Sequence, residues 1–268
     1  MKKVINYILL MILFTACKRD DGRTQSSFHE VSINEAYPCK DTLTKLGNEY
    51  TAAGIPGIVM AVYSPSWGYW GTANGYSELE TKTAMNLQNL QYLQSVSKTY
   101  LAAGILKLRE EGRVNLDAPI TSYLPARYAG YIDQASTMTV RNLLNHTSGM
   151  PDYLENPEYI SRALQHPEHV FSSDEFLRYI KNVRRLFVPG SRFSYSNTNY
   201  HVLALIADSI YGSHDRLIRE KVLTPLGLFH TYYRNIAGLP ALVKNYLDYS
   251  GTGELQNVTV LQQSSIMG

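Results

Sequence analysis

Ser95 and Lys98 are the residues of this 268-residue chain whose types and spacing suggest chemistry. They lie three positions apart in "QSVSKTYLAAGILKLREEG", where an amphipathic helix is predicted to begin. On a helix this spacing places both side chains on one face. A serine hydroxyl becomes an effective nucleophile when a neighbouring base accepts its proton, and burial at a helix N-terminus lowers the pKa of a lysine. The pair predicts an acylated serine with a lysine base.

The same two residues allow a plainer interpretation. Ser95 could cap the helix, a position that serine often fills, and Lys98 could be a solvated surface lysine. A lone S-x-x-K occurs by chance about once in a chain of this length. A lysine in the first helical turn is, however, disfavoured by the helix macrodipole, and this placement favours the catalytic interpretation. The N–H of Ser95 would then point toward an oxyanion.

Two further stretches carry candidate partners for this pair. Tyr195 and Asn197 lie in "VPGSRFSYSNTNYHVLALIAD", before a predicted helix; the phenol could share proton transfer with Lys98, and the amide could hold a substrate amide. Tyr233-Arg234-Asn235 is a rival tripeptide in a less suggestive context. "VRNLLNHTSGMPDY" offers His146 for a Ser-His-Asp triad, although no G-x-S-x-G elbow occurs in the chain.

A metal site is the weaker alternative. His166 and His169 in "HPEH" have metal-like spacing, but Pro167 disturbs a helix there and no third ligand suggests itself. We therefore predict no metal, and no organic cofactor is implied.

The elements that must position these residues follow from hydrophobic periodicity. We predict a helix over residues 39–53, a pair of strands over 58–63 and 67–73, and a helix from Ser95 that ends at Gly112. Helical pieces and loops follow to about residue 186, then a helix after Asn199 and a short β-like run over 258–261. A two-stranded hairpin alone is marginal in water, so the strand pair needs neighbours.

Composition and the N-terminus narrow the class of protein. Apolar residues make up 44% of the chain and the net charge is +2 with no basic run, which gives no support for nucleic-acid binding. Residues 1–16 have a basic start and a short apolar run, too short to span a bilayer. With "FTAC" they resemble a bacterial lipoprotein signal with Cys17 as the lipidated residue; an ordinary cleavage site after Ala16 is the alternative. Residues 17–36 then form a polar tether.

Three motifs in order, "QSVSKTY", "LLNHTSGMPDY" and "PGSRFSYSNTNYHVLALIAD", resemble the serine β-lactamase and penicillin-binding-protein superfamily, in its class C β-lactamase-related branch. The resemblance implies an α/β (α+β) sandwich with an inserted helical domain, roughly residues 115–215. It implies that Ser95 is acylated, that Lys98 and Tyr195 transfer protons, and that Asn197 contacts the substrate or Lys98. His146 belongs to a structural loop in that family.

Two departures from the family pattern stand out. Gln94 precedes the serine where glycine is common, and no Lys- or His-x-Gly motif follows Tyr195. We therefore expect residues 37–268 to be an incomplete domain that lacks its C-terminal strands.

The expected protein is a lipid-anchored serine hydrolase of the bacterial cell envelope, facing the periplasm or the outer-membrane surface. It would act through a Ser95 acyl-enzyme on a β-lactam, a D-amino-acid peptide such as a peptidoglycan fragment, or an ester. The alternative is a non-catalytic envelope lipoprotein that uses the fold as a binding module. The oligomeric state stays open.

Overall fold

The computed structural model describes residues 32–233, 239 and 241–260. These residues belong to one compact unit that begins at Ser32. The predicted signal peptide, Cys17 and most of the predicted tether lie outside the described residues. Within the described part, no helix is long and apolar enough to cross a membrane.

An antiparallel sheet with the order β1-β2-β3 forms the first layer. Strands β1 (Gly57–Ser64) and β2 (Gly68–Glu78) pair with Val59 opposite Ala73, and β3 (Thr83–Ala84) adds a short edge to β2. The hairpin is the one predicted, and β2 continues beyond the predicted end.

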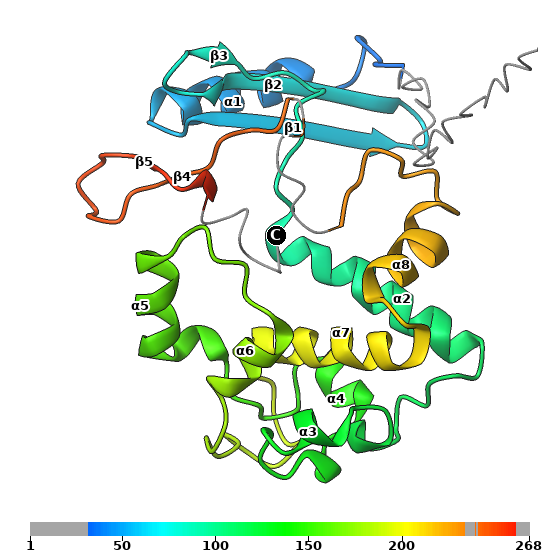
Figure 1. The fold of residues 1–268 in the computed structure, drawn as a ribbon. Helices are drawn as coiled ribbons and strands as arrows, with labels where there is room; N and C mark the ends of the chain where they lie inside the picture. Colours follow the sequence, from blue (N-terminus) through cyan, green and yellow to red (C-terminus); the bar gives the residue numbers. More distant parts are fainter. Residues whose placement is uncertain (1–31, 234–238, 240, 261–268) are drawn as a thin grey trace, which may run out of the picture. The chain divides into compact units, whose positions relative to one another are not determined.

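Helix α1 (Lys40–Ala52) packs on this sheet, as Figure 1 shows. Gly47 makes the close approach possible, because a Cβ there would lie 2.3 Å from the Asn74 side chain. Asn74 Nδ2 also donates to Asn48 Oδ1 at 2.7 Å, which ties the helix to β2. The predicted helix over residues 39–53 is therefore present with nearly the expected bounds.

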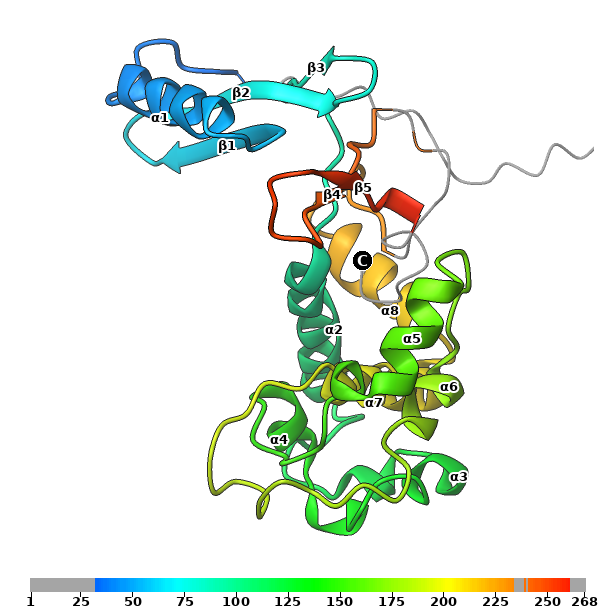
Figure 2. The ribbon, with the colours of Figure 1, turned by 90° about the vertical axis from the view of Figure 1, so that its left-hand side faces the viewer.

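The hydrophobic core lies among the helices, where α2 (Lys98–Glu110) packs against α7 (Asn197–Tyr211) and α8 (His214–Ile218), as Figure 2 shows. The predicted apolar face of α2 is buried through Leu101, Ile105 and Leu108. On α7 every residue from Asn197 to Ala207 is buried. Helix α7 ends at Gly212, whose φ of 91° lies in the left-handed region that favours glycine.

Short helical pieces separated by loops fill the region between α2 and α7, as predicted. Some begin with strong local signals: Thr139 starts α4 and Ser172 starts α6, each in a capping box with the residue three positions on. The pieces are η2 (Ile120–Ser122), α3 (Ala126–Ala129), η3 (Ala135–Thr137), α4 (Val140–Leu144), η4 (Tyr153–Glu155), α5 (Pro157–Gln165) and α6 (Ser173–Arg178). A π-helical turn, η5 (Arg219–Leu223), continues α8.

The predicted β-like run over 258–261 is wrong in its position. The strand found there is β5 (Gln256–Asn257), which pairs with β4 (Tyr246–Leu247). Val258 is buried after the strand, and residues 259–260 are helical. Asn257 Oδ1 accepts hydrogen bonds from the N–H and the hydroxyl of Thr259, at 3.1 and 2.6 Å. This local side-chain turn ends the strand.

Candidate active site

Ser95 lies in a 3₁₀ turn, η1 (Gln94–Ser97), that leads directly into α2. Lys98 is the first residue of α2, and its Nζ donates to Ser95 Oγ at 2.9 Å. The capping interpretation of Ser95 is wrong, because the N-cap position is Ser97 and no side-chain cap bond forms there. Gln94 has a φ of 49°, in the left-handed region that favours glycine. The backbone explains why glycine suits that position.

Tyr195 and Asn197 come from the start of α7, about a hundred residues along the chain. Tyr195 Oη donates to Ser95 Oγ at 3.0 Å. Asn197 Oδ1 accepts from Lys98 Nζ at 2.9 Å and from Tyr195 Oη at 3.4 Å. The structure thus brings together all four site residues predicted from the sequence. In the rival tripeptide, Tyr233 packs edge-on against the ring of His214, 5.6 Å between ring centroids, while Arg234 and Asn235 lie outside the described residues.

The electrostatic environment of Lys98 suits a base. Its side chain is buried, and this desolvation lowers the pKa of Lys98 from that of an ordinary lysine. A hydrogen bond to Tyr195 and the charge of Asp152 act in the opposite direction and raise this pKa. The amine therefore becomes uncharged more readily than a surface lysine would, which a proton acceptor requires.

His146 packs against the ring of Tyr195. Within the described residues it makes no hydrogen bond to Ser95. Its ring stacks on the Tyr195 ring at 4.3 Å between centroids. Its Nδ1 accepts from the Ser196 N–H at 3.2 Å, and burial lowers the pKa of His146. A neutral imidazole fits this acceptor role. The Ser-His-Asp alternative is not formed, and His146 lies in a structural loop as the resemblance implied.

Asp152 is the site residue that sequence reasoning missed. Its Oδ2 accepts from the Asn197 N–H at 3.0 Å and from Asn197 Nδ2 at 2.8 Å. The residue lies within the second recognised motif, but its partner is 45 positions away, and spacing within the motif carries no information about that contact.

The two histidines of "HPEH" do not form a metal site with other side chains of the described residues. His169 Nε2 lies 2.9 Å from Glu175 Oε1, and the ring of His166 approaches Glu168 at 3.8 Å. In the part of the chain that the structure describes, no group of three or more His, Cys, Asp or Glu side chains is arranged to hold a metal ion.

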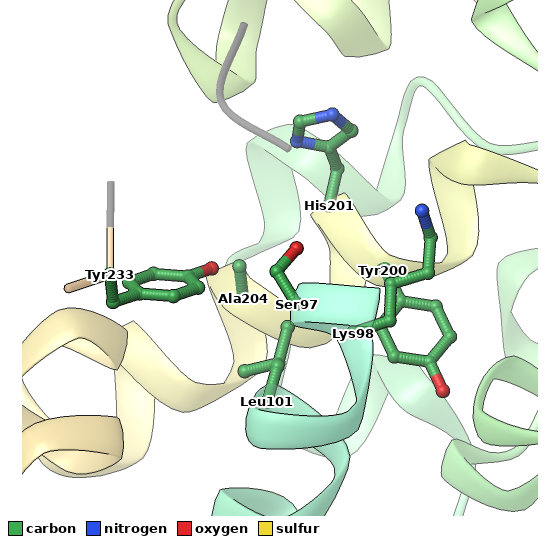
Figure 3. A pocket seen from close by; sticks show the side chains of 7 residues that line it. All are labelled: Ser97, Lys98, Leu101, Tyr200, His201, Ala204 and Tyr233. Atoms are coloured by element: carbon green, nitrogen blue, oxygen red, sulfur yellow. The ribbon is translucent and has the colours of Figure 1, made fainter. Parts of the chain in front are cut away.

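A small hollow lies beside Lys98, between the start of α2 and the first turns of α7, as Figure 3 shows. His201 borders it and is itself fully buried, with its Nε2 atom 3.2 Å from Tyr153 Oη. Burial lowers the pKa of His201 to about 3, so its ring is neutral at physiological pH. The residues around the hollow are Ser97, Lys98, Leu101, Tyr200, His201, Ala204 and Tyr233.

Known proteins resemble this chain in sequence and in fold. Protein flp of Staphylococcus aureus is 27% identical over 184 residues, which cover 67% of this chain and 35% of flp. A putative D-alanyl-D-alanine carboxypeptidase of Escherichia coli is 29% identical over 181 residues, covering 64% of this chain and 40% of that protein. The chain therefore spans well under half the length of these curated relatives.

A solved structure agrees with these relatives. The crystal structure of a D-stereospecific amidohydrolase from Streptomyces sp. superposes with a TM-score of 0.71 at 25% sequence identity, covering 81% of this chain and 64% of that one. The mixed helix-and-sheet fold of the described residues is thus that of a β-lactamase-like protein. The Beta-lactamase family model matches residues 42–256, most of the chain. The chain belongs to the β-lactamase family, within the serine hydrolase superfamily that includes the penicillin-binding proteins.

Proposed function

We propose that this protein hydrolyses amide bonds of D-amino-acid derivatives through a covalent ester on Ser95. The observation that carries the proposal is the convergence of two proton-transfer groups on one hydroxyl. Lys98 Nζ and Tyr195 Oη lie 2.9 and 3.0 Å from Ser95 Oγ. Both distances are within the reach that a general acid or base needs.

The proton route follows from the same contacts. With Lys98 uncharged, Ser95 Oγ attacks the substrate carbonyl carbon while its proton passes to the Lys98–Tyr195 pair. The carbon–nitrogen bond then breaks, and the amine leaves with that proton. Water next attacks the Ser95 ester by the reverse route and releases the carboxylic acid. Nothing is oxidised or reduced in either half of the reaction.

The start of the helix supports the charge that develops on the substrate oxygen. Ser95 lies in the turn that leads into α2, and the first N–H groups of a helix point out of its N-terminal end. Its own N–H is thus placed to donate to an oxyanion close to the attacking Oγ.

The choice of a D-amino-acid amide is supported by the relatives. The amidohydrolase from Streptomyces sp. is named for D-stereospecific amide hydrolysis, and the Escherichia coli relative for a D-alanyl-D-alanine bond. β-Lactams and simple esters, which react with the same nucleophile chemistry, are the competing substrates.

A fluorophosphonate probe tests the nucleophile directly. We expect mass spectrometry to map the adduct to Ser95, and Ser95→Ala to abolish labelling. p-Nitroanilides of D- and L-alanine, nitrocefin and a p-nitrophenyl ester then rank the substrates, with the D-anilide expected to exceed its L-form. A wild-type protein that takes no label would favour the non-catalytic binding module. Preference for nitrocefin or the L-anilide would overturn the substrate class alone.

We also propose that the protein works at the bacterial cell envelope, held by a lipid on Cys17. The support is the basic start, the short apolar run and the "FTAC" sequence at the N-terminus.

A further inference from the structure

Asp152 is a half-buried carboxylate that the proton route above does not use. Its Oδ2 accepts both the N–H and the side-chain Nδ2 of Asn197, while its Oδ1 accepts the Leu154 N–H at 3.0 Å. An ionised carboxylate can only accept hydrogen bonds. Asn197 must therefore turn its NH₂ group toward Asp152 and its oxygen away from it.

We propose that Asp152 is a positioning residue that holds the Asn197 amide with its oxygen toward Lys98 and Tyr195. The inference rests on the proposed function, in which these two groups carry the proton of Ser95. In the observed orientation, Asn197 Oδ1 accepts from both of them. If the amide turned over, its N–H groups would face the Lys98 amine and the Tyr195 hydroxyl, and the acceptor that orients Lys98 would be lost.

The segment that carries Asp152 is fixed by contacts of its own. The Pro151 carbonyl accepts from Thr198 Oγ1 at 2.7 Å and from Ser196 Oγ at 3.2 Å. The Tyr153 N–H donates to Thr198 Oγ1 at 3.1 Å. Since these bonds flank position 152 on both sides, a change of the Asp152 side chain leaves its backbone docked on the start of α7.

Asp152→Asn is the informative change. An asparagine can still accept from Leu154, because asparagine serves as well as aspartate at such a capping position. Its NH₂ group would then meet the two donors of Asn197. One of the two amides must turn over, and the oxygen facing Lys98 is the contact at risk.

The measurement is the rate of fluorophosphonate labelling of Ser95 in the 268-residue chain, taken across pH. We expect Asp152→Asn to lower the plateau rate roughly 10- to 100-fold, the scale of losing a hydrogen bond to a charged group. The acid limb of this profile is the pH range in which the labelling rate drops as Lys98 becomes protonated. We also expect this limb to move to lower pH, because the Asp152 charge otherwise raises the pKa of Lys98. This shift reports the Asp152 charge itself, so the positioning role is tested by the plateau rate.

A double-mutant cycle shows whether Asp152 acts through Asn197. On an Asn197→Ala background, Asp152→Asn should cost roughly twofold or less at the plateau. Asp133→Asn is the matched control. Asp133 is also half-buried and accepts a distant backbone N–H, from Arg185 at 3.1 Å, but among the described residues it makes no hydrogen bond to the site. It should label at the wild-type rate.

The outcomes separate the two proposals. Labelling of Asp152→Asn at the wild-type rate, or its full loss repeated on the Asn197→Ala background, overturns the positioning role while the nucleophile stands. If wild-type Ser95 takes no label, the proposed function fails and the positioning role falls with it. Should Asp152→Asn not fold, Asp152→Glu keeps the charge but moves the carboxylate by one methylene relative to the two Asn197 donors, so its plateau rate should fall; a wild-type plateau rate would contradict the inference.

Discussion

At the residue scale, Lys98 is held between opposing influences. Burial disfavours its charge and lowers its pKa, whereas the Tyr195 hydrogen bond and the Asp152 carboxylate favour the charge. The rings of Tyr195 and Tyr200 lie 5.2 and 5.8 Å from Nζ and also favour a cation. A buried amine surrounded by acceptors can release and regain a proton without leaving its place beside Ser95.

Lys98→Arg tests whether this amine titrates during the reaction. Arginine keeps the charge but does not deprotonate in proteins. The rate at which Ser95 is labelled should therefore fall by a factor of about 10² or more. The uncharged amine forms as pH rises through its lowered pKa, so wild-type labelling should rise with pH and this limb should vanish in the variant. Lys107→Arg, an exposed change on the same helix, is the control. A Lys98→Arg protein that labels like wild type would refute the base.

The residues of the site differ in how far sequence predicts them. Ser95 and Lys98 are neighbours on one helical turn, so their spacing alone predicts the contact. Tyr195 and Asn197 could be assigned only through the family pattern, because nothing local links them to Ser95. Asp152 and the stacking of His146 depend on the folded path of the chain. The geometry of the four predicted residues is observed, and their catalytic roles stay predictions.

At the element scale, α7 combines the site and the core in one helix. Its first residue, Asn197, contacts Lys98, and one turn later His201 lies fully buried against the ring of Phe176, 4.1 Å between centroids. A histidine in such surroundings stays neutral when its free counterpart would be charged. Burying His201 in this helix therefore lowers the free energy of unfolding at acidic pH.

His201→Gln measures that cost. Burial lowers the pKa of His201 from 6.5 to about 3 in the folded protein. Below about pH 6.5 the His201 side chain binds a proton in the unfolded chain but stays unprotonated in the folded chain. The free energy of unfolding therefore decreases as the pH is lowered, by up to about 1.4 kcal/mol per pH unit. Urea unfolding at neutral and mildly acidic pH should show a smaller loss in the variant.

The control for this measurement is His166→Gln, since the His166 side chain is exposed. It should lose stability on acidification as wild type does. Equal losses in His201→Gln and wild type would show that His201 is protonated inside the fold.

The elements themselves were largely predictable where periodicity is long. Helix α1 and the apolar face of α2 follow from regular spacing of leucines and isoleucines, and Gly112 marks the predicted end of α2. The predicted start of α2 is three residues too early, because Ser95 lies in a 3₁₀ turn and not in the helix. The strand predicted over 258–261 is absent from the described residues 258–260, because the Asn257 side chain accepts hydrogen bonds from Thr259 and residues 259–260 are helical.

At the scale of the whole molecule, the described residues form a β-lactamase-like domain, and the proposed lipid-anchor site, Cys17, lies in the segment before Ser32. Replacing Cys17 by serine tests the proposed anchor. A palmitate analogue fed to a bacterial host should label the wild-type protein and not the variant, because only the cysteine thiol can accept the lipid. Cys39→Ser, which changes the other cysteine of the chain, should keep the label. A signal that survives Cys17→Ser would contradict the anchor.

The continuous burial of α7 also limits how this protein can diversify. From Asn197 to Ala207 no position on the helix is exposed, so any replacement there alters packing together with the site. Exposed apolar side chains that are close to the site residues in the sequence can change without that penalty, such as Val96 beside Ser95 and Phe193 two positions before Tyr195. The turn before α2 and the loop before α7 can therefore vary in sequence more freely than the helix that holds Asn197.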